Sequence, residues 1–275
     1  MPHMPDRDFS TISPTARGLL YMKAITTKIP YLWEAAELIM GTSGIDFECR
    51  YVSIDRAIDG LSINNFMELA SGYSFRSLEM TRDRDCFYLD TDLPELIDSK
   101  RELAEAILSR ESRVEGRLPR FLALNALDES AFDDACNVIP TGPICIINEG
   151  LLVYLDDSEK RRLCALIYKI LVERGGVWVT GDIYTRRPPD VIPRPVSSEV
   201  ARFLAQHKVV ENSFDSFESA MDFFAQCGFA AERHTADEVY DGLSSLEAAR
   251  RLQPIDEEQL RARLNLRQTW VLRPQ

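Results

Sequence analysis

The sequence predicts an α/β protein with a doubly wound, mostly parallel sheet behind a cap of helices. From about residue 65, short apolar runs alternate with longer amphipathic stretches, which is typical of βαβ units. Before that point, apolar residues such as Leu19, Leu20, Met22 and Ile25 recur near helical spacing. A chain of 275 residues can bury a substantial core. We therefore expect a single domain, with the helical cap over residues 1–61 and the sheet core over 62–275.

Five apolar runs are the strongest candidates for strands, and they cover residues 66–70, 86–90, 121–124, 144–148 and 177–180. A helix is expected from Pro94 to about residue 108, because proline is tolerated in a first helical turn. A second helix is expected over 158–173, closed by Gly175 and Gly176.

The alternation then stops in a segment rich in proline and arginine, so we expect an irregular insertion over about 183–215. Long insertions of this kind are usually lids or mobile loops. After it the pattern predicts a helix near 217–227, a short run at 229–233 and a last strand at about 269–272.

Composition excludes several classes of function. A formal net charge of −12 argues against a nucleic-acid duplex as the main partner. The start has no basic region followed by an apolar core, and no apolar run is long enough to span a bilayer, so we expect a cytoplasmic protein without a membrane partner. The six cysteines form no C-x-x-C pair, and we expect them to be reduced and structural, with no metal site.

Small or polar residues follow four of the predicted strands. They are Ala70-Ser71-Gly72 after the first, Asp90 and Asp92 at the second, Asn125 after the third and Glu149 after the fourth. Carboxyl ends of strands meet at one edge of such a sheet, where ligands bind. A small-residue turn, a carboxylate for ribose hydroxyls and an amide for an adenine amine together fit an adenosine-containing ligand.

Each of these residues also has an alternative interpretation. Residues 70–72 would serve as a plain turn, Asp92 as the N-cap of the helix at Pro94, and Asn125 as a strand end. Glu149, between two apolar segments, needs a buried partner whichever interpretation holds.

The phosphate-binding motifs G-x-G-x-x-G and G-x-x-x-x-G-K-[ST] are absent, since the first turn runs Ala70-Ser71-Gly72-Tyr73-Ser74-Phe75. A ligand with adenosine but no phosphate fits better, and S-adenosylmethionine is the obvious one.

Three stretches carry a family resemblance: residues 68–76, residues 89–94 together with Lys100, and residues 148–155. In order and spacing the chain resembles the leucine carboxyl methyltransferase family and its tetracenomycin-type polyketide O-methyltransferase relatives across about residues 10–182. The resemblance implies a seven-stranded Rossmann-like methyltransferase sheet, S-adenosylmethionine as cofactor and methyl transfer to oxygen.

The resemblance also assigns site residues. Arg50 would pair the methionine carboxylate, and the turn Ala70, Ser71 and Gly72, with Glu68 before it, would hold the cofactor. Asp92 would take the ribose hydroxyls with Asp90 close by, and Asn125 and Ala126 would meet the adenine. Glu149 would lie near the amino group or the sulfonium, Tyr154 would shape the pocket, and Lys28 would be a further pocket residue. In the chain, Ala70 replaces a usual glycine and Asn125 a usual aspartate.

Methyl transfer from a sulfonium mainly needs positioning of an oxygen nucleophile. We expect His207 on a solvated helix face and His234 at a strand end, so neither is expected to be a base. A carboxylate or an acidic hydroxyl of a small molecule or peptide is then the expected acceptor. Arg186 and Arg187, beside the fifth strand, would clamp an anionic substrate or simply lie in a solvated loop.

Two other classes of function stay open at this stage. One is a non-catalytic interaction module that has lost cofactor binding, which Ala70 and Asn125 favour. The other is a nucleotide-dependent oxidoreductase, which the missing glycine motif disfavours.

Overall fold

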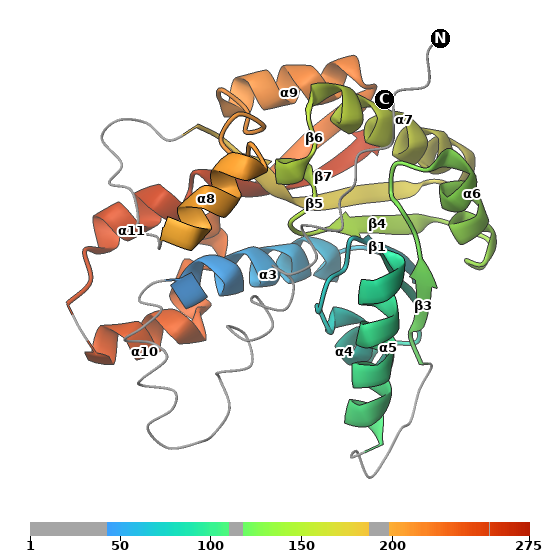
Figure 1. Ribbon diagram of the computed structural model, residues 1–275, viewed down its shortest axis with the longest axis horizontal. Helices are drawn as coiled ribbons and strands as arrows, with labels where there is room; N and C mark the ends of the chain where they lie inside the picture. The colour runs from blue at the N-terminus through green and yellow to red at the C-terminus, as the bar shows by residue number, and fades with distance from the viewer. Residues whose placement is uncertain (1–42, 110–117, 187–197, 253) are drawn as a thin grey trace.

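A seven-stranded sheet forms the centre of the molecule, with helices on both of its faces (Figure 1). The computed structural model describes residues 43–109, 118–186, 198–252 and 254–275. The strands are β1 (Asn65–Leu69), β2 (Phe87–Asp92), β3 (Arg120–Ala123), β4 (Ile144–Asn148), β5 (Gly176–Tyr184), β6 (Phe229–His234) and β7 (Arg267–Pro274). The strand order β3-β2-β1-β4-β5-β7-β6 confirms the predicted doubly wound sheet.

The helices alternate with the strands along most of the chain. They are α3 (Ser43–Asp59), α4 (Arg76–Asp83), α5 (Pro94–Leu108), α6 (Glu129–Asn137), α7 (Asp157–Arg174), α8 (Ser198–Gln206), α9 (Phe217–Gln226), α10 (Ser244–Leu252) and α11 (Glu257–Leu264), with short 3₁₀ turns η2 (Leu152–Tyr154), η3 (Ala236–Glu238) and η4 (Tyr240–Gly242). Helices α3, α4 and α5 lie on one side of the sheet, and α6, α7 and α9 on the other (Figure 1).

The two faces of the sheet carry separate apolar cores, because successive side chains of a strand point to opposite faces. Phe66, Cys145 and Val179 pack with α3 and α4 on one face. Met67 and Ile146 pack with α6, α7 and α9 on the other. Cys145 and Cys86 are both buried, as expected of small core residues.

The point where strand order reverses lies between β1 and β4. Both strands run parallel, and Leu69 pairs with Asn148 in the register. On the other side of β1, β2 is also parallel, with Glu68 opposite Asp90. The carboxyl ends of β1, β2 and β4 therefore meet at one edge, which is where ligands bind in open α/β sheets.

The predicted strands are confirmed in place, with corrected ends. The second strand does not stop at Asp90 but continues to Asp92, because Thr91 and Asp92 still pair with Leu122 and Ala123 of β3. The fifth is longer than residues 177–180, because β7 pairs with it in the antiparallel direction as far as Tyr184 across an irregularity after Thr180. The one antiparallel strand, β7, also extends beyond residues 269–272.

The segment 183–215 is only partly irregular. Its start belongs to β5, Thr185 bridges to Phe214, and residues 198–206 form helix α8. The four prolines that predicted an irregular insertion all lie before residue 198, so α8 occupies the part of the segment without them. Residues 187–197 and the helices expected before residue 43 lie outside the described residues.

In the described ranges, no helix combines the length and the apolar character required to cross a bilayer.

Candidate functional site

The turn after β1 is tightly wound. Ala70 has φ of 48° and Gly72 a φ of 51°, both in the left-handed region. Ser71 donates its backbone N–H to the Thr91 carbonyl at 2.9 Å, and Ser74 donates to the Ser71 carbonyl at 2.9 Å. An alanine in this conformation costs roughly 1–2 kcal/mol. The surrounding hydrogen bonds therefore hold Ala70 in a left-handed backbone conformation. Glycine would adopt this conformation without that cost.

Asp92 ends β2 beside this turn. Its Oδ2 accepts the Gly72 N–H at 2.7 Å, and its Oδ1 accepts the Leu93 N–H at 2.7 Å. Helix α5 has its N-cap at Leu93 without a side-chain capping bond, so Asp92 does not cap that helix. Burial raises the pKa of Asp92, and the two backbone hydrogen bonds oppose that rise. The carboxylate thus faces the turn, with partners that carry no full charge.

Asp90 lies two residues earlier on β2 and is completely buried. Its Oδ1 is 2.9 Å from Lys100 Nζ, itself fully buried, and its Oδ2 accepts a hydrogen bond from Ser77. Burial raises the pKa of Asp90 to about 6, against the pull of Lys100. These contacts are those of an internal ion pair at the end of β2.

A buried polar atom beside Asp92 has no hydrogen-bond partner within the described residues. It is Ser71 Oγ, at the centre of the turn. A buried hydroxyl without a partner is unfavourable, so such an atom is a natural contact for a ligand. The residues at this strand end therefore fit a group that brings hydroxyls or other polar atoms to the turn.

Asn125 and Ala126 follow β3, next to the end of β2, since Asp92 pairs with Ala123. Asn125 Oδ1 accepts the Leu127 N–H at 3.1 Å. A carbonyl oxygen has a second lone pair, so this bond leaves an acceptor position on Asn125. Ala126 is buried.

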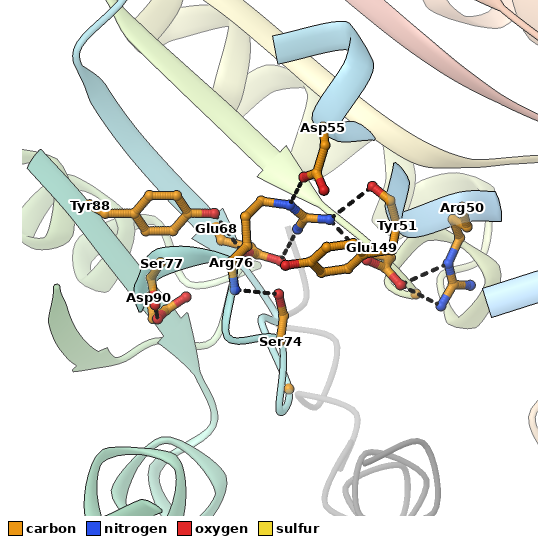
Figure 2. A network of polar contacts seen from close by, with 12 residues as sticks. Arg50, Tyr51, Asp55, Glu68, Ser74, Arg76, Ser77, Tyr88, Asp90 and Glu149 are labelled. Carbon is orange, nitrogen blue, oxygen red and sulfur yellow. Dashed lines mark hydrogen bonds and ion pairs between the residues drawn. The ribbon is translucent and has the colours of Figure 1, made fainter. Parts of the chain in front are cut away.

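Glu149 follows β4 and is held by two arginines from different helices (Figure 2). Its Oε1 accepts from Arg50 Nε at 3.1 Å, and Arg50 Nη2 lies 3.0 Å from the same oxygen. Its Oε2 accepts from Arg76 Nη2 at 3.3 Å. Arg50 also donates to the Tyr184 hydroxyl at 2.6 Å. Burial alone would lower the pKa of Arg50, but Tyr184 and Glu149 outweigh it and raise that pKa.

Close approach of α3 to the sheet makes the Arg50–Glu149 pair possible. A side chain at Gly181 would put its Cβ 2.9 Å from Ile54 Cδ1 and 3.0 Å from Arg50 Cγ. Glycine at this position of β5 therefore leaves room for the helix that carries Arg50.

Arg76 is the centre of the buried polar network in Figure 2. It donates to Asp55 Oδ1 at 2.6 Å and to Glu68 Oε1 at 2.9 Å, and its guanidinium lies 4.1 Å from the Tyr51 ring centroid. The Tyr88 hydroxyl donates to the other oxygen of Glu68 at 2.6 Å. Glu68, predicted to contact the cofactor, is thus wholly buried and supports Arg76.

Asp182, in β5, was not among the predicted site residues. It nevertheless comes directly after the predicted run 177–180 and Gly181, so a search of strand ends could have found it. It is buried, and it accepts the N–H groups of Gly150, Leu151 and Leu152 at 2.7, 2.6 and 3.1 Å. It also accepts from Asn148 Nδ2 at 2.7 Å. Asp182 therefore fixes the backbone that carries Glu149.

His207 does not lie on a solvated face, and that expectation was wrong. It is 5% exposed and packs against Tyr154 and Phe203, with ring centroids 6.0 and 4.3 Å away. Asn212 Nδ2 donates to the Val153 carbonyl at 3.1 Å. These contacts fold the segment after α8 over η2, which an interpretation of the insertion as irregular could not foresee. His234 does end its strand, β6.

Arg186 is exposed and pairs with Asp215 at 2.6 Å, so it has the contacts of a surface arginine. Lys28 and Arg187 lie outside the described residues. Within the part of the chain that the structure describes, no group of three or more His, Cys, Asp or Glu residues could hold a metal ion.

Comparison with known proteins supports the fold of a methyltransferase. No family model and no curated protein matches the chain. Among solved structures, a candidate methyltransferase from Thermobifida fusca has a TM-score of 0.59 at 15% identity, covering 94% of each chain. A DUF574 family protein from Streptomyces avermitilis has a TM-score of 0.58 at 15% identity, covering 95% of this chain and 97% of its own.

PigF, solved with SAH (S-adenosylhomocysteine), has a TM-score of 0.50 at 13% identity; the match covers 86% of this chain but only 57% of PigF. At these identities the likeness concerns the fold. The chain has the fold of class I S-adenosylmethionine-dependent methyltransferases, with the sheet order 3-2-1-4-5-7-6 and an antiparallel seventh strand.

Proposed function

We propose that this protein is an S-adenosylmethionine-dependent methyltransferase that acts on an oxygen of a small molecule or peptide, either a carboxylate or an acidic hydroxyl. The observation that carries the proposal is the end of β2. There the Asp92 carboxylate and the unpartnered Ser71 hydroxyl stand together beside a turn that has no phosphate-binding motif.

The end of β2 would hold the adenosine part of the cofactor. A carboxylate has about four lone-pair positions, and the two backbone N–H groups of Gly72 and Leu93 use one on each oxygen of Asp92. The remaining positions can accept from two ribose hydroxyls. Asn125, on the adjacent strand end, would accept from the adenine amine.

The end of β4 would hold the amino-acid part. A guanidinium carries five N–H donors, and the described contacts of Arg50 with Glu149 and Tyr184 involve three of its nitrogens but not all five hydrogens. Arg50 would therefore donate to the cofactor carboxylate while Glu149 accepts from the ammonium. Arg76, 3.3 Å from the other oxygen of Glu149, would hold that carboxylate in place.

When bound, S-adenosylmethionine supplies a methyl group on a sulfonium that is already a good leaving group. The task of the protein is to orient the acceptor oxygen and exclude water. Tyr154 and His207, whose ring centroids lie 6.0 Å apart, would form one wall of the acceptor pocket. A carboxylate acceptor needs no base, which is why we favour it over a neutral hydroxyl.

The interaction-module alternative is less well supported by the structure than by the sequence. Ala70 keeps the left-handed conformation of a glycine, so its presence does not open the turn. The oxidoreductase alternative still lacks a glycine motif for a pyrophosphate.

Thermal unfolding in the presence of four ligands tests the proposal. S-adenosylmethionine and S-adenosylhomocysteine at about 100 times Kd should add about 2.7 kcal/mol to the free energy of unfolding. For a chain of this size that raises Tm by roughly 5–10 °C. NAD and ATP at the same concentration should leave Tm unchanged.

A shift with NAD or ATP of the same size would favour the oxidoreductase class instead. No shift with any of the four ligands, at millimolar concentration, would favour the interaction module.

A further inference from the structure

Tyr184 connects the arginine at the end of β4 to the last strand of the sheet. It ends β5 and pairs with Arg267 of β7 in the antiparallel register. Its hydroxyl accepts a hydrogen bond from Arg50 Nη1 at 2.6 Å. The Arg267 guanidinium lies 5.1 Å from the centroid of the same ring. One tyrosine therefore contacts two arginines that come from different elements.

The face of the sheet on which Tyr184 lies depends on an irregularity in β5. Thr180 pairs with Trp270, and Ile183 pairs with Gln268. Over this step β5 advances three residues, from 180 to 183, whereas β7 advances two, from 270 to 268. Such an extra residue is a β-bulge. Because side chains alternate between the faces of a sheet, one extra residue reverses the face of those that follow.

The two apolar cores show this reversal. Before the irregularity, Trp178 belongs to the core on the side of α6, α7 and α9, and Val179 to the core on the side of α3. Strict alternation would place Ile183, five residues after Trp178 in the sequence, on the side of α3. It lies in the other core instead. The next residue, Tyr184, therefore points to the side of α3, where Arg50 lies.

Further contacts fix the backbone and the ring of Tyr184. Its carbonyl accepts the Phe214 N–H at 2.9 Å. Arg267, which lies against the ring, is held in turn by Asp46, whose Oδ1 is 2.5 Å from Arg267 Nη2. Asp46 lies one helical turn before Arg50 on α3. These contacts together keep the hydroxyl at Arg50.

The hydroxyl matters because the other partner of Arg50 would be shared with a ligand. Arg50 Nε and Nη2 both contact Glu149 Oε1, at 3.1 and 3.0 Å. In the proposed complex Glu149 would also accept from the ammonium of the cofactor. Tyr184 would meanwhile keep its hydrogen bond with Arg50. Since the donors of a guanidinium form a rigid planar fork, one fixed bond at Nη1 restricts the direction of all the others.

We propose that Tyr184 is a positioning residue, whose hydroxyl orients the Arg50 guanidinium toward the carboxylate of S-adenosylmethionine. This inference rests on the proposed function, in which Arg50 binds that carboxylate. It adds that part of the preference for a ligand with an amino acid comes from a residue that does not itself contact the ligand.

Tyr184→Phe tests the assignment, because it removes the hydroxyl and keeps the ring that lies against Arg267. Titration calorimetry gives the affinities for S-adenosylhomocysteine and 5′-methylthioadenosine. S-adenosylhomocysteine should bind roughly 3–10 times more weakly, the usual effect of one lost hydrogen bond. The affinity for 5′-methylthioadenosine, which lacks the amino acid, should stay within about twofold of the wild type. Equal weakening of both ligands would overturn the assignment, because it would indicate a general loss of structure.

Tyr168→Phe is the matched control. Tyr168 lies in α7, on the opposite side of the sheet from α3, and its exposed hydroxyl donates to the Gln275 carbonyl at 3.5 Å. This variant should bind both ligands as tightly as the wild type does.

A double-mutant cycle shows whether Tyr184 acts through Arg50. In an Arg50→Met background, Tyr184→Phe should change the affinity for S-adenosylhomocysteine by less than about twofold, because the group that it orients is absent. A further loss as large as that in the wild-type background would mean that Tyr184 contacts the ligand itself, and it would overturn the positioning role.

The same titrations separate failure of this inference from failure of the proposed function. If the wild type bound neither ligand, the proposed function and the role of Tyr184 would both be wrong. If the wild type bound S-adenosylhomocysteine and Tyr184→Phe bound it equally tightly, only the role of Tyr184 would be wrong.

Discussion

The ends of β2 and β4 both present a carboxylate at the same edge of the sheet, but they hold it by opposite means. Among the described residues, Asp92 accepts hydrogen bonds from neutral backbone N–H groups, those of Gly72 and Leu93. Glu149 is bound by two arginines, Arg50 and Arg76, and its loop is fixed by Asp182. Backbone N–H groups therefore hold the carboxylate at the end of β2, whereas charged side chains hold the one at the end of β4.

The difference indicates which part of a ligand each end suits. A carboxylate among neutral donors keeps its charge uncompensated and suits neutral hydroxyl groups, which are donors. At the other end, a carboxylate is paired with two guanidinium groups. There a ligand carboxylate can bind a guanidinium, and a ligand ammonium can bind the protein carboxylate. A nucleoside that carries an amino acid matches this order along the edge.

Arg76→Met breaks the charged end and should have the largest effect. It leaves Glu68, which is fully buried, with only the Tyr88 hydroxyl, and it removes one partner of Glu149. Loss of one partner from a buried ion pair costs about 3–5 kcal/mol. Urea unfolding should show a loss of that size.

The matched control is Arg82→Met. Arg82 lies in the same helix, pairs with Asp83 and is more than half exposed, so its replacement should change the free energy of unfolding by less than about 0.5 kcal/mol. If the two variants lowered the free energy of unfolding equally, the buried network would contribute no more to stability than an exposed ion pair.

The second carboxylate of β2 predicts a pH dependence. The pKa of Asp90 is raised to about 6 in the folded protein, from an ordinary value of 3.8. The native state therefore binds more protons than the unfolded state between these values, and this group's stabilising contribution is lost as pH rises from about 4 to about 6. The full effect is on the order of 3 kcal/mol.

Replacing both partners with neutral groups, Asp90→Asn with Lys100→Met, should remove that loss. The free energy of unfolding, measured from pH 4 to pH 6.5, should then rise more steeply with pH in the double variant than in the wild type. Parallel profiles would mean that Asp90 is ionised at pH 4.

Two ligands can separate the two strand ends. Asp92→Ala should weaken the binding of both S-adenosylhomocysteine and 5′-methylthioadenosine, which share the ribose, by roughly 1.5–3 kcal/mol. Arg50→Met should weaken only S-adenosylhomocysteine, because 5′-methylthioadenosine lacks the amino acid. Titration calorimetry gives both affinities.

Asp98→Ala is the control for Asp92, since Asp98 is exposed and pairs with Arg101; it should bind both ligands as the wild type does. If Arg50→Met weakened the binding of both ligands equally, the proposal that β2 binds the ribose and β4 the amino acid would be wrong.

The smallest effect concerns the neutral end. Ala70→Gly relieves a positive φ that costs alanine roughly 1–2 kcal/mol, while glycine adds about 0.4–1 kcal/mol of unfolded-state entropy. The variant should be more stable than the wild type by roughly 0.5–1 kcal/mol, with unchanged affinity for S-adenosylhomocysteine, in thermal unfolding and calorimetry. A less stable variant would show that Ala70 is not strained.

Strands β1, β2 and β4 of the parallel half were predictable because each is a buried, largely apolar run. Strand β3 is only partly buried, but its apolar residues 121–122 still marked it. The ends were less predictable: Asp92 interrupts the apolar pattern of β2, yet its backbone continues to pair with β3. The antiparallel entry of β7 depends on pairing partners far apart in the chain, which local periodicity does not report.

For the site, too, features local to one strand end were predictable, whereas contacts between distant segments were not. Strand-end reasoning located Asp92, Asn125 and Glu149, because parallel strands align their carboxyl ends. It did not find Arg76, whose role depends on three carboxylates from separate elements. Nor did it find that His207 lies against Tyr154, since that contact needs the path of the chain after α8.

A crystal structure of the protein soaked with S-adenosylhomocysteine tests the central claim most directly. Both ribose hydroxyls should lie within about 3.2 Å of the Asp92 oxygens, and the amino acid should lie between Arg50 and Glu149. A nucleoside bound away from these three residues, or no nucleoside at this edge of the sheet, would contradict it.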